Sequence, residues 1–406
     1  MRRVEQLARR TQISKILSFF DSLPRFIHVP KPLLLGSSNN SEILIEGDTT
    51  SSRVKGILAN LDEPFNPHLK SQQIWGGIKR EQPGNSFVHI HQQLQKGFPE
   101  LCLLKGHGHC GQKIVRAHAV QKALFKNHAK NGHVYQFEPI NGTRDADKRL
   151  WPDLIGIKRA TTFTGFCECH DSHTFATIDN SQFQNTPEYK FLYHYRAFAQ
   201  TYYDFAHKFK TIESAVKEMS KTLPATELKS LSADIETNQR DVQELQGHKS
   251  TYEQWLREKN WPAVEGYAFA GDTMPDILAT GFFAPRKDLQ GNVVQDCKSR
   301  GPLGWVSMTV AASNDKAVFL LCAEKGSLVL SKLVNSFRRL PAASQTTAII
   351  TYVFCHFENF ILLPGWWEPL PKETQLKFVN AFEGRYYRRE MPHTSDWKLK
   401  ELVWGA

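Results

Sequence analysis

Long apolar runs are missing from this sequence, and so are the short signatures of several large enzyme classes. No run reaches the roughly 18 to 20 apolar residues that a membrane-spanning helix needs, which predicts a soluble protein without a membrane partner. The sequence has no GxxxxGK[ST], no GxGxxG after a predicted strand, no GxSxG and no HExxH. These absences disfavour an ATPase, a dehydrogenase and an α/β-hydrolase.

Cysteine is infrequent, and its distribution is uneven. The chain has 7 cysteines, an odd number, and four of them fall between Cys102 and Cys169. Such clustering favours metal binding in a reducing compartment over the disulfide framework of a secreted protein. We therefore expect a cytoplasmic protein.

Apolar residues and positive charge are both plentiful. The chain has 406 residues, of which 41% are hydrophobic and 11% aromatic, so it can form two or three domains with buried cores. The formal net charge of +10 favours a polyanionic partner such as DNA or RNA.

The pattern along the chain predicts an α+β multidomain protein with four segments. Residues 1–97 hold a basic N-terminal helix, which also resembles an organelle transit peptide, and then an irregular region around 30–90. Residues 98–186 are chemically dense, 187–261 are helical, and 262–406 form a mixed α/β C-terminal domain that is rich in strands and ends in a basic tail. The tail cluster RYYRRE could contact phosphates or lie solvated, and it contains Arg385, Arg388 and Arg389.

Two apolar stripes with heptad spacing predict a long antiparallel helical hairpin over 187–261. Thr186 and Pro187 suit the start of the first helix, and Pro224 separates the two arms. The second stripe has two polar breaks, at Asn238 and Lys249. The hairpin is expected either to pack on its own chain or to serve as a spacer or self-association surface. The first stripe consists of Phe191, Tyr195, Phe198, Tyr202, Phe205, Phe209, Ile212, Val216, Met219 and Leu223.

Three β-branched and aromatic runs predict strands in the C-terminal segment. They are GWVSMTVAA, KAVFLLCAEK and TTAIITYVFCHFENFILLP. Cys322 and Cys355 lie inside these runs and are expected to be buried as small apolar residues.

The stretch CLLKGHGHCGQKIVRAH, residues 102–118, predicts half of a zinc site. Zinc usually takes four Cys or His ligands, delivered as two pairs. Cys102 and Cys110 are the candidate first pair, with His107 and His109 as alternates in a glycine-rich turn. The second pair is Cys167 and His170 in GFCECHDSH, where a two-residue gap lets both side chains reach one ion. Cys169 and His173 are reserves for this second pair.

The order of these features resembles a diverged HNH endonuclease with a ββα-metal core, over about residues 98–186 only. A metal knuckle comes first, then a histidine in an apolar strand, then a second knuckle. On this resemblance His118 matches the general base that activates water, and a separate divalent ion such as Mg²⁺ would assist. Thr162 stands where the family pattern has asparagine, and His170 or His173 could serve the catalytic metal. His118 could instead be a further zinc ligand or a packed core residue.

Three functions are compatible with these features. The first is a zinc-containing nucleic-acid-binding protein, which in its more specific form is an endonuclease that uses His118. By analogy with the family, this function suits bacterial defence against foreign nucleic acid. The second is a non-catalytic, zinc-stabilised protein that binds a protein partner through the hairpin and the C-terminal domain. The third is a phosphate-binding module that uses the basic tail.

Overall fold

The computed structural model describes residues 100–111, 113–138, 142–147, 149–219, 225–297, 301–383 and 391–402, with side chains except at 207–219, 225–238 and 240. The expected basic N-terminal helix, the irregular region at 30–90 and the arginine cluster at 385–389 lie outside these residues. The distal parts of the two apolar stripes also lie outside the described side chains.

An eight-stranded sheet with the order β10-β5-β8-β7-β6-β9-β2-β3 lies at the centre of the described part, and every neighbouring pair is antiparallel. Its strands are β2 (His133–Gln136), β3 (Asp153–Gly156), β5 (Val264–Ala270), β6 (Ile277–Phe283), β7 (Val306–Ser313), β8 (Lys316–Glu324), β9 (Phe360–Leu362) and β10 (Lys400–Glu401). Two of the predicted runs, GWVSMTVAA and KAVFLLCAEK, are the adjacent strands β7 and β8.

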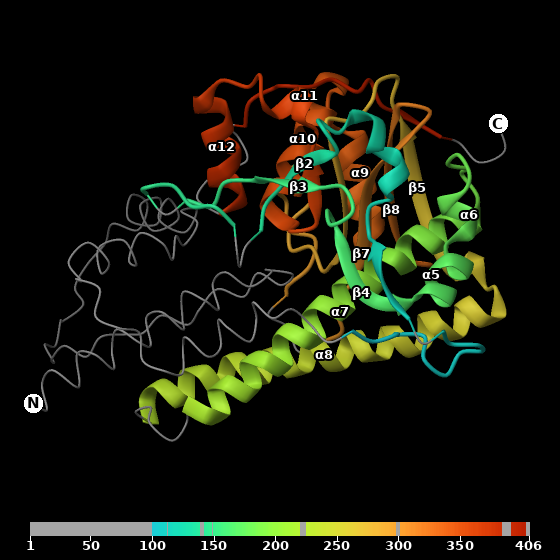
Figure 1. Cartoon of the computed structure of the whole chain (residues 1–406), viewed down its shortest axis with the longest axis vertical. Helices are drawn as coiled ribbons and strands as arrows, with labels where there is room; N and C mark the ends of the chain where they lie inside the picture. Colours follow the sequence, from blue (N-terminus) through green and yellow to red (C-terminus); the bar gives the residue numbers. More distant parts are fainter. Residues whose placement is uncertain are drawn as a thin grey trace, which may run out of the picture. The chain divides into compact units, whose positions relative to one another are not determined.

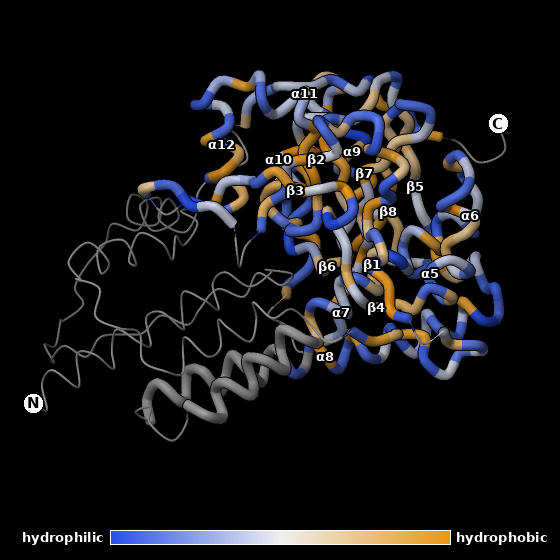
Figure 2. Tube along the Cα trace, viewed as in Figure 1, coloured by the Kyte–Doolittle hydropathy of each residue, from blue (hydrophilic) through white to orange (hydrophobic). Residues whose placement is uncertain are grey.

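Both faces of the central strands are buried. Along β8, Phe319 and Leu321 join a core shared with α9 (Leu328–Arg338) and α10 (Ala342–His356), whereas Leu320 and Cys322 join a second core shared with α7 (Pro187–Met219). Because side chains alternate between faces, burial on both sides requires a continuous apolar run rather than alternation with polar residues. Figure 2 shows the hydrophobic residues gathered in the sheet and its covering helices.

Helices on the α9–α10 side complete the first core. Besides α9 and α10, α11 (Pro364–Trp367) and α12 (Lys372–Phe382) contribute Trp367, Phe378 and Val379 to it. Figure 1 shows α12 beside α10. Ser327 caps α9, since its side chain accepts a hydrogen bond from the Leu330 amide. No helix among the described residues is long and apolar enough to span a membrane.

The third predicted strand run is mainly helical, so this prediction was wrong. Of TTAIITYVFCHFENFILLP, the first part lies in α10 and only Phe360–Leu362 forms a strand, β9. Ile350, Tyr352, Val353 and Phe354 are all buried, so the helix is apolar around most of its circumference and shows little helical periodicity. Packing on the sheet overrides the β preference of its Ile, Val and Thr residues. Cys322 is fully buried as expected, and Cys355 in α10 is partly buried.

The helices α7 and α8 (Ala225–Glu258) are both long and contact each other (Figure 1). Thr186 caps the start of α7 as expected, because its hydroxyl accepts from the Tyr189 amide at 3.4 Å. Phe191, Tyr195 and Phe198 of the first stripe are core residues under the sheet. The segment 220–224 lies outside the described residues, so the hairpin as a whole stays a prediction.

A second, two-stranded sheet carries the chemically dense segment. It pairs β1 (Ile114–His118) with β4 (Thr162–Cys167), and α5 (Glu168–Thr174) and α6 (Ala176–Asp179) follow β4 directly. In the sequence β2 and β3 lie between β1 and β4, but they belong to the large sheet, because β2 pairs with β9. The boundaries proposed near residues 186 and 261 stay predictions, and the sheet and the second core extend across both.

The sequence predicts a helix from about Ile114 or His118 to Lys130, a turn at Asn131-Gly132 and then a strand HVYQF. The short segment after β1 differs from this helix. It forms two 3₁₀ turns, η1 (Lys122–Leu124) and η2 (Lys126–His128). Asn131 and Gly132, with φ of 51° and 74°, then make the expected turn before β2. A third 3₁₀ turn, η3 (Trp261–Ala263), links α8 to β5.

One histidine lies deep in the second core. His194 of α7 is fully buried, its Nδ1 lies 2.9 Å from the Ser307 hydroxyl of β7, and the rings of Tyr252 and Phe282 meet it edge-on. Burial, together with the nearby His248, lowers the pKa of His194 to about 3. In the native state this ring therefore stays neutral at pH values at which an exposed histidine would be protonated.

This burial predicts an acid-sensitive contribution to stability. Between pH 6.5 and 3 the unfolded chain binds a proton at residue 194 and the native chain does not. The contribution of His194 to the free energy of unfolding is therefore present at neutral pH and is lost as the pH falls. From pH 7.5 to 5.0 this amounts to about 2 kcal/mol of unfolding free energy. We expect the free energy of unfolding, measured by urea titration, to fall less between these two pH values in His194→Gln than in the native protein. Exposed His133→Gln is the control, and equal falls in all three proteins would contradict the assignment.

Candidate metal centre

Four side chains from two separate segments meet beside the β1–β4 pair. Cys102 lies in an extended segment whose neighbours bond to β4, through Leu101 N to Thr164 O and Leu103 N to Gly165 O. The chain then turns through Gly106 and Gly108, both at positive φ, and returns at Cys110. Cys167 is the last residue of β4, and His170 lies in the first turn of α5.

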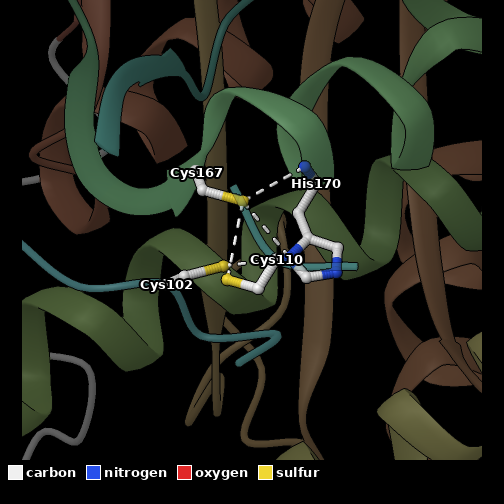
Figure 3. A group of neighbouring side chains, drawn as sticks. All are labelled: Cys102, Cys110, Cys167 and His170. Atoms are coloured by element: carbon white, nitrogen blue, oxygen red, sulfur yellow. Dashed lines mark hydrogen bonds between the residues drawn. The ribbon is translucent and has the colours of Figure 1, made fainter. Parts of the chain in front are cut away.

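The candidate ligand atoms of Cys102, Cys110, Cys167 and His170 all lie within 4.8 Å of one another. The Nδ1 of His170 is 3.1 Å from Cys102 Sγ and 3.4 Å from Cys167 Sγ, and Cys110 Sγ is 3.7 Å from Cys167 Sγ. Figure 3 shows these groups converging on one point. Three of the residues are buried and Cys110 is half-buried. The cluster could hold a metal ion such as zinc.

Hydrogen bonds to the backbone orient the second candidate ligand pair, Cys167 and His170. Cys167 is the N-cap of α5, and its sulfur accepts a hydrogen bond from the His170 amide at 3.4 Å. The other ring nitrogen of His170, Nε2, lies 2.7 Å from the carbonyl oxygen of His107 and donates to it. This bond leaves Nδ1 unprotonated and directed at the sulfur atoms, which is the orientation usually seen in histidine ligands of metals.

The three thiols differ in acidity. Burial raises the pKa of Cys102 to about 12 and also raises that of Cys110. Burial would raise the pKa of Cys167 too, but hydrogen bonds from the His170 amide and from the Cys110 and Cys102 thiols lower it to about 7. Cys167 is therefore the first thiol to ionise. A bound cation would displace protons from the other two, because thiolates are the metal-binding form.

The alternates considered from sequence lie outside the cluster. His109 is exposed, and the Cys169 sulfur faces His173 at 3.6 Å. His173 is on the exposed side of α5, where its Nδ1 bonds to the Cys169 carbonyl at 2.7 Å. Among the described residues, no other group of three or more Cys, His, Asp or Glu side chains lies close enough together to hold a metal ion.

The role of His107 was missed from sequence, where it was only an alternate ligand. Its carbonyl orients His170, and its ring contacts Glu253 of α8 at 3.0 Å. Glu253 belongs to no motif or apolar stripe in the sequence. The signal for it was Lys249, a polar break in the second apolar stripe, which pairs with Glu253 at 2.6 Å.

The two other predicted catalytic residues, His118 and Thr162, lie opposite each other on β1 and β4. The Nε2 of His118 donates to the Ile157 carbonyl at 2.9 Å, and burial lowers the pKa of this imidazole below its usual value. The ring is thus neutral at pH 7 with Nδ1 as its acceptor. The Thr162 hydroxyl donates to the Arg159 carbonyl at 2.8 Å.

Besides burial, the charges of Lys122 and Arg196 lower the pKa of His118, and the charge of Asp179 raises it. Arg196 of α7 forms two 2.7 Å bonds to Asp179 and stacks on Phe175 with its guanidinium carbon 4.1 Å from the ring centre. Burial raises the pKa of Asp171, which Arg196 partly offsets. The sequence also offers Asp145 or Asp147 as a carboxylate for a divalent ion near His118, and in the structure both pair with Arg149.

Comparison with known proteins finds no family model, no curated protein and no solved structure that matches this chain. The resemblance to HNH endonucleases therefore depends on the sequence pattern, and the structure adds that Cys102, Cys110, Cys167 and His170 form a cluster that could bind a metal ion.

The structure places Cys110 in the candidate ligand set and Cys169 outside it. We expect Cys110→Ser to lower the metal content of the purified protein from about one ion per chain to near zero, because loss of the half-buried Cys110 leaves three ligands and opens the fourth position to water. Cys169→Ser should retain the native content, as measured by elemental analysis after gel filtration. Equal metal content in the two variants would contradict this ligand set.

Proposed function

We propose that this chain is a zinc-stabilised nucleic-acid-binding protein, and that zinc at Cys102, Cys110, Cys167 and His170 has a structural role. The observation that carries the proposal is the closed and largely buried Cys₃His set. A catalytic zinc site keeps one position open for water, whereas four protein ligands complete the tetrahedron of a structural site.

The order of elements supports an HNH-like ββα unit around this centre. The first ligand pair precedes β1, the second pair lies at the junction of β4 and α5, and the strands β1 and β4 are antiparallel neighbours. Zinc would tie the extended segment at Cys102 to the start of α5, and so would hold together a two-stranded sheet that is too small to be stable alone.

Charge around this unit supports a nucleic-acid partner. Residues 100–138 contain six basic and two acidic residues, a net charge of +4. All six basic side chains are exposed, and two of them, Lys113 and Lys130, pair with Glu168 and Glu368. Lysine and arginine on one short segment attract phosphates and make affinity dependent on salt.

Two lysines of this segment provide a test of nucleic-acid binding. We expect the double variant Lys122→Glu and Lys126→Glu to bind duplex DNA or RNA at least tenfold more weakly at about 100 mM salt, with a shallower dependence of affinity on salt, because phosphate contacts are lost. Fluorescence anisotropy measures both quantities. Lys377→Glu with Lys398→Glu, which changes the charge by the same amount elsewhere, is the control. Equal weakening by both pairs would indicate net charge alone, and absence of binding by the native protein would contradict the proposal.

Phosphodiester cleavage by His118 is a second candidate function. The observation that favours it is a neutral imidazole, oriented by the Ile157 carbonyl and with Nδ1 as acceptor. These are the properties of a general base near pH 7. In this proposal a divalent ion such as Mg²⁺ assists, with Thr162 and His173 as the further candidate residues.

Removal of the imidazole tests this candidate. We expect His118→Ala to cleave plasmid or RNA at least 100-fold more slowly than the native protein with Mg²⁺, Mn²⁺ or Ni²⁺, since general-base catalysis contributes about that much. Its zinc content should stay native. His133→Ala, at an exposed ring, should cleave at the native rate. Loss of zinc in His118→Ala would identify a ligand, and absence of His118-dependent cleavage on either substrate would exclude the nuclease.

A further inference from the structure

The turn between the first two candidate ligands is connected to a helix far along the chain. The ring of His107 lies between two side chains of α8, with Nε2 3.0 Å from a Glu253 oxygen and Nδ1 2.7 Å from the Arg257 guanidinium. A guanidinium can only donate, so Nδ1 accepts and Nε2–H donates to the carboxylate. A single neutral tautomer of His107 therefore satisfies both partners.

The carboxylate of Glu253 depends on these contacts. The residue is only 4% exposed, and Lys249 lies 2.6 Å away on the preceding turn of the helix. Lys249, Glu253 and Arg257 recur every four residues and so share one face of α8. Lys249 belongs to α8 and would stay beside Glu253 without the His107 turn, but the second carboxylate oxygen would lose the contact with His107, so the turn in place stabilises this face of α8.

Another face of α8 is held by the large sheet. His248 Nδ1 lies 2.9 Å from a Glu324 oxygen of β8, and the Tyr252 hydroxyl donates to the same oxygen at 3.0 Å. The second half of α8 thus lies between the sheet and the turn that carries the metal ligands.

We infer that metal binding and the docking of α8 are energetically linked, with His107 as the positioning residue between them. The inference depends on the zinc centre proposed above. Through its carbonyl His107 orients the ligand His170, and through its ring it bonds Glu253. The metal ion holds the glycine-containing turn in the position that α8 requires. By reciprocity, the docked helix holds the turn in the position that the metal requires.

The experiment uses the full chain loaded with zinc, the variant Glu253→Gln and the control Glu258→Gln, an exposed residue at the end of the same helix. Hydrogen exchange over residues 241–258 is measured before and after chelation, and the zinc dissociation constant is measured by competition with a chelator. In the native protein we expect chelation to raise exchange in α8 more than in β7 and β8. Glu253→Gln should raise exchange in α8 with zinc bound and increase the dissociation constant about tenfold, the range found for residues that support metal ligands. Glu258→Gln should match the native protein.

The outcomes separate this inference from the zinc proposal. Unchanged exchange in α8 after chelation of a protein that binds about one zinc ion, or an equal rise in α8, β7 and β8, would overturn the linkage and leave the structural zinc in place. A native dissociation constant in Glu253→Gln would overturn it too. A native protein that binds no zinc overturns both. The comparison within the native protein needs no substitution, so it decides even where Glu253→Gln does not fold.

Discussion

Burial of the central sheet on both faces is the constraint on which the rest of the described structure depends. Alternate residues of β8 enter two different cores, so each face needs its own cover of helices. On one side α9 and α10 supply it, and on the other the first half of α7 does. Because this first half of α7 is itself buried between the sheet and the β1–β4 pair, even its polar residues His194 and Arg196 are enclosed and bonded.

The candidate metal centre lies beside the two-stranded β1–β4 sheet, and its residues Cys102 and Cys167 belong to the second core. The two-stranded sheet has little core of its own, and its first ligands come from irregular backbone around Cys102 and Cys110. Cross-linking by a metal ion compensates for a small core, because the free energy of binding adds directly to folding. The contact between His107 and Glu253 extends this cross-link to α8, so that one ion would stabilise segments more than 140 residues apart in sequence.

The candidate ligand set was predictable because its second half is local. A Cys-x-x-His at the end of a strand places one side chain at the N-cap and the other in the first turn of the following helix, as Cys167 and His170 are. Cys102 and Cys110 were chosen for their clustering, and the structure brings them to the same point. The α10 prediction failed for the opposite reason. A helix buried around most of its surface has no amphipathic period, and its β-branched residues suggest a strand unless the packing partners are known.

The sequence by itself determined the properties that depend on near neighbours: the cap at Thr186, the strands β7 and β8, the turn at Asn131-Gly132, and the pairing of Cys167 with His170. Only the tertiary structure decided the joining of β2 and β3 to the large sheet, the burial of Glu253 and the role of His107. These features depend on contacts between distant segments, and a residue type or a spacing does not specify which surface it will meet. His107 illustrates the difference: its position in a glycine-rich turn could be read from sequence, but its partners come from distant helices, His170 from α5 and Glu253 and Arg257 from α8.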